Sequence, residues 1–132
     1  MKRQIRRGVF ETNSSSVHSI SIMTNDEYYE FCNKEMYLYE GYGWGFENTL
    51  NKPEKGKIYS YEEVIDFLKH SDYPPSSDFD WDDEDEVYEI IIGNDFYNSD
   101  YYFNRDYETF EKTYTTPAGE KIVAFGYYGH DY

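Results

Sequence analysis

The strongest constraint on the fold lies near the carboxyl end, where two alternating segments flank a short turn. Residues 109–116 (TFEKTYTT) and 121–129 (KIVAFGYYG) alternate in polarity, and Pro117-Ala118-Gly119-Glu120 stands between them. Alternation with period two is typical of a half-buried strand, and a short connection containing Pro and Gly is typical of a hairpin loop. The sequence therefore predicts a carboxyl-terminal β-hairpin and, with it, an antiparallel sheet.

Three further segments have the composition of strands. Residues 17–23 (VHSISIM) alternate, with Val17, Ser19 and Ser21 on one side and His18, Ile20 and Ile22 on the other. Residues 36–40 (MYLYE) form a shorter candidate. Residues 87–92 (VYEIII) form an apolar run, which predicts a buried strand that ends at the turn Gly93-Asn94-Asp95.

Two helices are expected from their start signals. Thr24 and Asn25 can cap a helix through residues 26–34, with Tyr28, Phe31 and Cys32 facing inward. Ser60-x-x-Glu63 is a capping box, and the apolar residues that follow it at helical spacing indicate a second helix. That helix must end before Pro74-Pro75. Its apolar residues are Val64, Ile65, Phe67 and Leu68.

The remaining segments read as connections. Residues 41–48 (GYGWGFEN) predict a tight turn or a bulged strand, and residues 51–57 and 96–107 predict loops. We therefore expect an α+β fold, with a mostly antiparallel sheet of four to five strands, two helices and the carboxyl-terminal β-hairpin. The length fits a single domain over residues 1–132, with a basic arm and polar loop at residues 1–16 and an acidic, aromatic-rich region at residues 71–108.

Charge decides which partners are compatible with the chain. The net charge is −15 and the isoelectric point is near 4.4. So strong a negative field repels nucleic acid and anionic lipid and attracts basic surfaces. We therefore expect neither direct nucleic-acid binding nor membrane binding. Because no apolar signal segment follows the basic residues 1–10, the expected location is the cytoplasm.

Cysteine and aromatic content further restrict which kinds of site the chain can contain. Cys32 is the only cysteine, which excludes an intrachain disulfide and a cysteine zinc site, and its predicted place on an apolar helix face suggests a buried thiol. Aromatic residues make up 21% of the chain, including 17 Tyr, so some rings must lie near the surface, where Tyr is enriched in binding interfaces. The sequence suggests no cofactor and no metal ion.

The acids are concentrated in the region 71–108, where Arg105 is the only basic residue, and they alternate there with aromatic residues. If this segment were extended, alternate carboxylates would lie about 6.5–7 Å apart on one face, a spacing similar to that of phosphates. Aromatic side chains between them would add contact area of the kind found at binding hot spots. The predicted partner-binding residues are Asp78, Phe79, Asp80, Trp81, Asp82, Asp83, Glu84, Asp85, Glu86, Tyr97, Asp100, Tyr101 and Tyr102.

Two other patterns in the sequence are a partial EF-hand loop and a candidate Ser/His pair. Asp78, Asp80, Asp82 and Glu89 match four ligand positions of an EF-hand loop, but Asp83 stands where that loop needs glycine. A Ser/His pair is imaginable between residues 14–16 and His18, but no third orienting group or nucleophile elbow accompanies it. Catalysis is therefore not expected.

The amino-terminal segment carries a resemblance. Residues 7–19 (RGVFETNSSSVHS) are similar to the start of many uncharacterised proteins of phages and mobile elements of Gram-positive bacteria. The resemblance covers about the first twenty residues; it implies a phage origin and carries no catalytic residue. In general character the chain is similar to small acidic anti-restriction and anti-CRISPR proteins.

Together these features lead to one functional hypothesis and two alternatives. The hypothesis is a phage-encoded inhibitor of a host defence protein, a monomer or homodimer in the host cytoplasm. It would occupy, by acidic mimicry, the basic groove of a host defence nuclease or of another nucleic-acid-binding protein. One alternative is a small-molecule or nucleotide-binding protein or enzyme centred on Asn13 to His18. The other is a structural protein of the virion.

Overall fold

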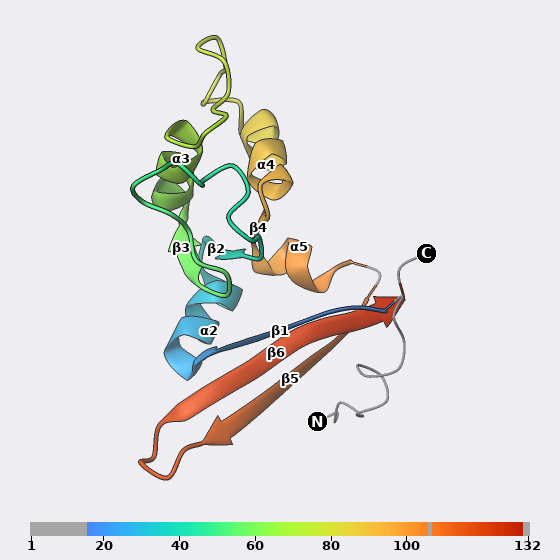
Figure 1. Cartoon of the computed structure of the whole chain (residues 1–132). Coiled ribbons are helices and arrows are strands. Elements are labelled where there is room, and N and C mark those ends of the chain that lie inside the picture. Colours follow the sequence, from blue (N-terminus) through green and yellow to red (C-terminus); the bar gives the residue numbers. More distant parts are fainter. Residues whose placement is uncertain (1–15, 106, 131–132) are drawn as a thin grey trace. The chain divides into compact units, whose positions relative to one another are not determined.

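A computed structural model describes residues 16–105 and 107–130 of the chain (Figure 1). Its residues divide into two compact units. The terminal unit takes its described residues from Met1–Tyr29 and Phe103–Tyr132, and the central unit is Glu30–Tyr102. The α+β class is confirmed, whereas the organisation as one domain over residues 1–132 stays a prediction.

The terminal unit is built on a three-stranded antiparallel sheet in the order β1-β6-β5. Its strands are β1 (Ser16–Thr24), β5 (Glu108–Thr115) and β6 (Lys121–His130). Strand β5 pairs with β6 from Thr115 opposite Lys121 to Glu108 opposite Tyr128, and β1 pairs with β6 over the whole length of β1. The long strands that the alternation predicts are therefore present as neighbours in one sheet.

The two faces of this sheet differ in burial. Met23, Val123 and Phe125 share one face and are buried, and the ring of Tyr28 packs on Phe125 with 4.8 Å between centroids. Ile22 lies on the opposite face and is 63% exposed. The side of β1 that carries Ile20 and Ile22 is thus the side that faces solvent, because burial follows the packing of Tyr28 and not the sequence of β1 alone.

Helix α2 (Asn25–Asn33) begins as expected. The Glu27 backbone N–H donates to the Thr24 hydroxyl at 3.1 Å, and the Thr24 N–H donates to the Glu27 carboxylate at 3.0 Å, so the two residues form a reciprocal cap. Phe31 is fully buried, as predicted. The prediction of a buried thiol at Cys32 is wrong, because the side chain lies on the exposed side of the helix.

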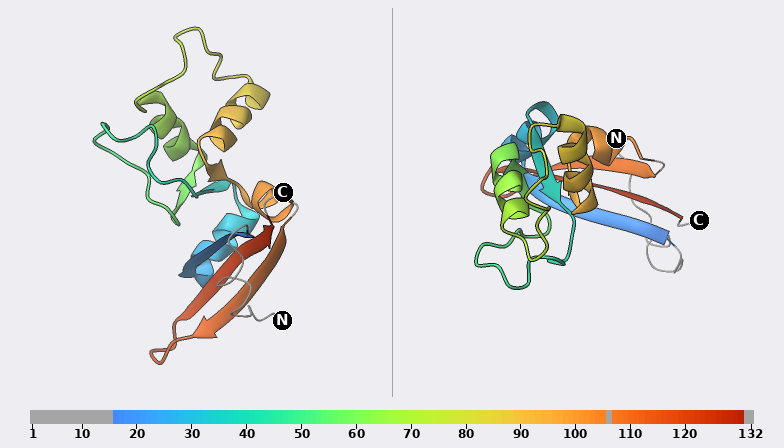
Figure 2. Two further views of the ribbon diagram at one scale, coloured as in Figure 1. Left: turned by 45° about the vertical axis from the view of Figure 1, so that its right-hand side comes forward. Right: turned by 90° about the horizontal axis from the view of Figure 1, so that it is seen from above.

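The central unit combines a second sheet with two packed helices. Strands β2 (Met36–Tyr39), β3 (Ile58–Ser60) and β4 (Phe96–Tyr97) form an antiparallel sheet in the order β3-β2-β4. Helices α3 (Tyr61–Lys69) and α4 (Glu84–Gly93) lie side by side in both views of Figure 2 and contact each other. The short α5 (Ser99–Phe103) follows β4.

Aromatic rings fill the core of the central unit. Phe96 is fully buried and packs against Tyr39 at 4.8 Å and Phe67 at 6.0 Å between centroids. The capping box at Ser60 and Glu63 is formed, which fixes the start of α3 and directs its apolar side into this core. The buried members of the core cluster are Tyr37, Tyr39, Phe46, Val64, Phe67, Leu68, Val87, Ile91 and Phe96.

Three expectations for the fold are wrong. Residues 87–92 are helical, because Asp83 caps a helix that begins at Glu84 and buries Val87 and Ile91 one turn apart. Residues 96–107, expected as a loop, contain β4 and α5. The described residues therefore hold four helices where two were expected, and their six strands form two sheets where one sheet was expected.

Candidate functional site

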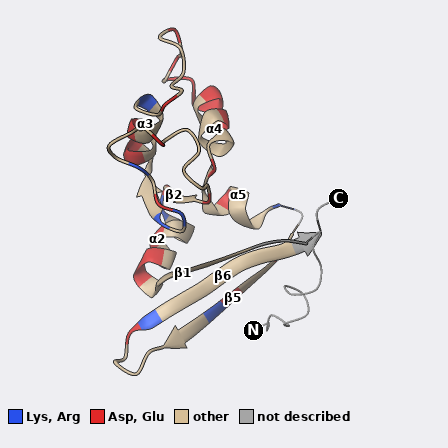
Figure 3. Cartoon of the chain, viewed as in Figure 1, with Lys and Arg blue, Asp and Glu red and all other residues tan. Residues whose placement is uncertain are grey.

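The acidic tract, residues 78–86, runs from the connection that follows α3 into the first turn of α4, in the central unit. Figure 3 shows acidic residues along the segment before α4 and on the first turn of that helix. Asp83 is the N-cap residue, and its carboxylate accepts hydrogen bonds from the N–H groups of Asp85 at 3.2 Å and Glu86 at 3.3 Å. The tract is therefore held by the start of a helix.

The part of the tract before the helix is made of turns. The Phe79 N–H donates to the Ser76 carbonyl at 3.0 Å, and the Asp83 N–H donates to the Asp80 carbonyl at 3.2 Å. The Asp80 carboxylate also accepts from the Asp82 N–H at 3.0 Å. The regular extended row expected of Asp78, Asp80 and Asp82 is thus wrong, because backbone turns replace the strand geometry that it needs.

The carboxylates of the tract nevertheless face solvent. Asp83 is half-buried because it caps the helix. The other acidic residues of the tract, all exposed, are Asp78, Asp80, Asp82, Glu84, Asp85 and Glu86. These charges are available to a partner, and turns and helix capping order their backbone.

Most of the predicted aromatic contact residues are used in packing. Phe79 and Trp81 are half-buried, pack edge to face at 4.8 Å and lie against the core cluster. Tyr97 and Tyr101 pack on each other at 4.9 Å. Tyr102 is 1% exposed, so its predicted role as a surface contact is wrong. Asp100, in α5, is exposed.

Exposed rings occur instead at positions that sequence reasoning missed. Tyr42 and Trp44 are 80% and 76% exposed, and Tyr73 is 85% exposed. Gly43 and Gly45 both have φ 89°, a backbone conformation that favours glycine, and the exposed Trp44 stands between them. The available signal was the alternation of glycine with aromatic residues in residues 41–45, since successive tight turns leave little room for burial.

Asp72 links the segment that carries Tyr42 and Trp44 to the segment that carries Tyr73. Its N–H donates to the Gly45 carbonyl at 2.7 Å, and its carboxylate accepts from the Asn48 N–H at 3.3 Å. The segment with Tyr73 is thereby tied to the segment with Trp44. The central unit therefore presents exposed aromatic rings in addition to its exposed carboxylates.

A cavity of about 520 Å³ opens beside the acidic tract. Ligand-binding pockets usually measure about 300–1,000 Å³. β2 and its flank, the first residue of α3 and the first two turns of α4 form the walls. The lining residues are Glu35, Tyr37, Tyr61, Glu84, Asp85, Tyr88 and Ile91. We call this the tyrosine–carboxylate cavity.

Contacts within the cavity fix its tyrosines. The Tyr37 hydroxyl donates to the Glu35 carboxylate at 3.3 Å, and the rings of Tyr37 and Tyr61 lie 6.4 Å apart. Burial raises the pKa of the Tyr61 phenol, and the charges of Glu35, Glu84 and Asp82 raise it further. The cavity therefore has a negative potential that disfavours anions.

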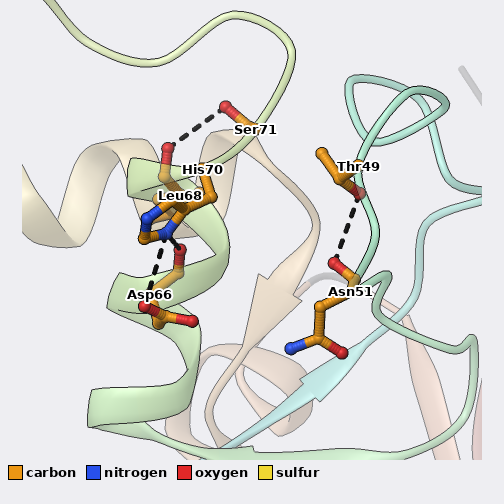
Figure 4. Close-up of polar contacts among 6 residues, drawn as sticks. All are labelled: Thr49, Asn51, Asp66, Leu68, His70 and Ser71. Atoms are coloured by element: carbon orange, nitrogen blue, oxygen red, sulfur yellow. Dashed lines mark hydrogen bonds and ion pairs between the residues drawn. The ribbon is translucent and has the colours of Figure 1, made fainter.

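The end of α3 brings a histidine, a carboxylate and a serine together, as Figure 4 shows. His70 Nδ1 lies 2.9 Å from the Asp66 carbonyl oxygen and 3.3 Å from its carboxylate. The Ser71 hydroxyl, however, donates to the Leu68 carbonyl at 3.1 Å. These are the contacts of a helix terminus, and they give the serine hydroxyl no histidine as a base.

The structure bears on three other sequence-based hypotheses: the Asn13–His18 site, a metal site and a membrane-spanning segment. Asn13, Ser14 and Ser15 of the alternative Asn13–His18 site lie outside the described residues, as do residues 1–15 of the basic arm and polar loop. Among the side chains that the structure describes, no three of His, Cys, Asp or Glu are grouped as metal ligands, the EF-hand positions included. Within residues 16–105 and 107–130, no helix has the length and apolar character needed to span a bilayer.

Comparisons with protein-family models, with curated proteins and with solved structures gave no match to this chain. The function is therefore argued from the site alone.

Proposed function

We propose that this protein binds a basic surface of another protein through the acidic tract. The specific form is a phage-encoded inhibitor that occupies the nucleic-acid-binding groove of a host defence nuclease. The observation that carries the proposal is the exposure of six carboxylates in nine consecutive residues whose backbone is ordered by turns and by the cap of α4.

Order matters because a fixed array of charges binds with a smaller loss of entropy than a mobile one. Exposed aromatic rings at Tyr42, Trp44 and Tyr73 supply rigid contact area on the same unit. The net charge of −15 adds long-range attraction to a basic partner and repulsion from nucleic acid. All three features favour a protein partner with a cationic surface.

The test is binding to a purified RNA-guided or restriction nuclease, measured by calorimetry from about 50 to 200 mM salt. We expect the affinity to fall at least about tenfold across that range, and DNA to compete for the same groove. A variant with Asp78→Asn, Asp80→Asn and Asp82→Asn should lose affinity to a similar extent. These amides keep the turn geometry and remove the charge.

The matched control removes the same number of charges elsewhere on the central unit, by Glu54→Gln, Glu62→Gln and Asp66→Asn. All three positions are exposed and lie outside the tract. The control should retain nearly all of the affinity. Affinity that is independent of salt, or equal losses in both variants, contradicts binding through the tract.

A further inference from the structure

The tyrosine–carboxylate cavity combines two features that point to one class of ligand. Tyr37, Tyr61 and Tyr88 contribute aromatic rings to its walls, and Glu35, Glu84 and Asp85 contribute carboxylates. Aromatic faces attract cations, and carboxylates form short, charge-assisted hydrogen bonds with N–H donors. No Lys or Arg is among the described residues that line the cavity, so its negative charge is not neutralised from within.

The chain itself contains this type of contact elsewhere. The Arg105 guanidinium lies 4.4 Å from the ring centroid of Tyr127, and Lys55 Nζ lies 4.5 Å from that of Tyr42. The contact of Lys55 lies at the protein surface and that of Arg105 is partly buried, and in both settings a cation over a tyrosine ring is favourable. The cavity offers the same rings with carboxylates beside them and without a cation of its own.

A guanidinium group suits the cavity better than an ammonium group. It is planar, so it can stack on a tyrosine ring, and its N–H groups can reach a carboxylate with two parallel hydrogen bonds. Ammonium is a compact and strongly hydrated charge that loses more hydration on entry. Phosphate and nucleotides are disfavoured by the three carboxylates.

We propose that the tyrosine–carboxylate cavity is a binding site for one guanidinium group. The source that we favour is an arginine side chain of the basic partner, which would enter the cavity while neighbouring basic residues contact the acidic tract. This inference rests on the proposed function for the identity of the source, although the chemistry of the cavity stands on its own lining.

The experiment titrates the full-length ¹⁵N-labelled protein with acetyl-arginine amide and follows the backbone signals of Tyr61, Glu84 and Tyr88 by NMR. Acetyl-citrulline amide, which has nearly the same shape without the charge, is the matched probe. We expect saturable shifts at these residues with the arginine probe and binding at least about tenfold weaker with the citrulline probe. Equal binding of the two probes, or no shift at the cavity residues, overturns the inference.

Variants assign the binding to the cavity. Glu84→Gln with Asp85→Asn should weaken binding of the arginine probe about tenfold, and Tyr61→Leu should weaken it by about threefold to fivefold. Glu89→Gln is the control, because Glu89 is exposed on the same helix and does not line the cavity. If Glu89→Gln weakened binding as much as the double variant, the probe would respond only to the overall negative charge of the protein. That result would refute a binding site in the cavity.

Two further arms identify the source. Agmatine presents a free guanidinium, and a Gly-Gly-Arg-Gly-Gly peptide presents one within a chain. Binding of the peptide as tight as agmatine or tighter supports a side chain of a partner, whereas binding of agmatine alone overturns that assignment.

The two proposals can fail separately. Salt-sensitive nuclease binding without guanidinium binding refutes the cavity site and leaves the function. Guanidinium binding without any effect of the tract variant on nuclease binding refutes the function and leaves the site.

Discussion

Asp83 is expected to stabilise the protein as a helix cap and not as a charge, and two substitutions separate these roles. Asp83→Ala removes the acceptor for the Asp85 and Glu86 N–H groups, which lie at 3.2 and 3.3 Å. Loss of such a cap costs about 0.5–2 kcal/mol, typically about 1 kcal/mol. Asp83→Asn keeps an amide oxygen in the same place and caps helices about as well.

The charge of Asp83 contributes little to the balance. A carboxylate near a helix N-terminus gains about 0.3–1 kcal/mol from the helix dipole at low ionic strength. Here the first turn of α4 already holds Glu84, Asp85 and Glu86, whose repulsion offsets that gain. We therefore expect Asp83→Asn to change the free energy of unfolding by less than about 0.5 kcal/mol and Asp83→Ala to lower it by about 1 kcal/mol.

The assay is urea unfolding followed by circular dichroism, with thermal unfolding as a second measure. A loss of about 1 kcal/mol should lower the Tm of a protein of this size by roughly 4 °C. Asp78→Ala is the control, since Asp78 is an exposed member of the tract that precedes the helix. Equal destabilisation by Asn and Ala would refute the capping argument and assign the effect to charge.

Three further outcomes are expected, each with its own measurement. Phe96→Ala should lower the free energy of unfolding in urea by about 3–5 kcal/mol, because it empties the centre of a fully buried ring cluster; a loss under about 1 kcal/mol would contradict that packing. Gly126→Ala should destabilise the terminal sheet, because the added Cβ would overlap the Ser19 carbonyl oxygen and lie 2.9 Å from the Phe110 ring; faster hydrogen exchange in β1 and β6 would report it, and unchanged exchange would speak against the close approach. Burial raises the pKa of Tyr37 and Tyr39, so the unfolded chain ionises first above pH 10 and stability, complete below that pH, should then fall by up to about 1.4 kcal/mol per pH unit for each residue; a fall of the same steepness in Tyr37→Phe and Tyr39→Phe, measured by urea unfolding above pH 10, would disprove the assignment.

Start signals and alternation were the features of the sequence that predicted structure well. The cap at Thr24, the capping box at Ser60 and the alternation of residues 109–116 each act within a few residues, so the sequence contains their whole cause. The strand predicted for residues 87–92 is wrong because a continuous apolar run fits a buried strand and a buried helix equally well. Asp83 and the acidic first turn decide for the helix, and these same residues also fit the pattern of partner-binding charge.

The site was predictable in its charge and not in its geometry. Acidic residues of the tract are exposed because a charged side chain is rarely buried unless it is paired. Which aromatic rings remain exposed depends on long-range packing: Tyr102 is buried, and Phe79 and Trp81 are half-buried against the core cluster. The cavity joins residues from positions 35 to 91, and sequence spacing carries no signal for such a meeting.

Salt should stabilise the folded protein and at the same time weaken its binding to a basic partner, so the binding hypothesis predicts opposite changes in Tm and affinity. A net charge of −15 places many like charges within one small fold, and their mutual repulsion opposes the compact state. Screening by salt weakens that repulsion and therefore stabilises the protein, while the same screening weakens attraction to a basic partner. A fall in affinity with salt is consequently informative only where the Tm rises over the same range, because the loss of binding then cannot come from unfolding. If the Tm fell with salt, repulsion between like charges would not be what opposes the compact state, and the argument from net charge would be refuted.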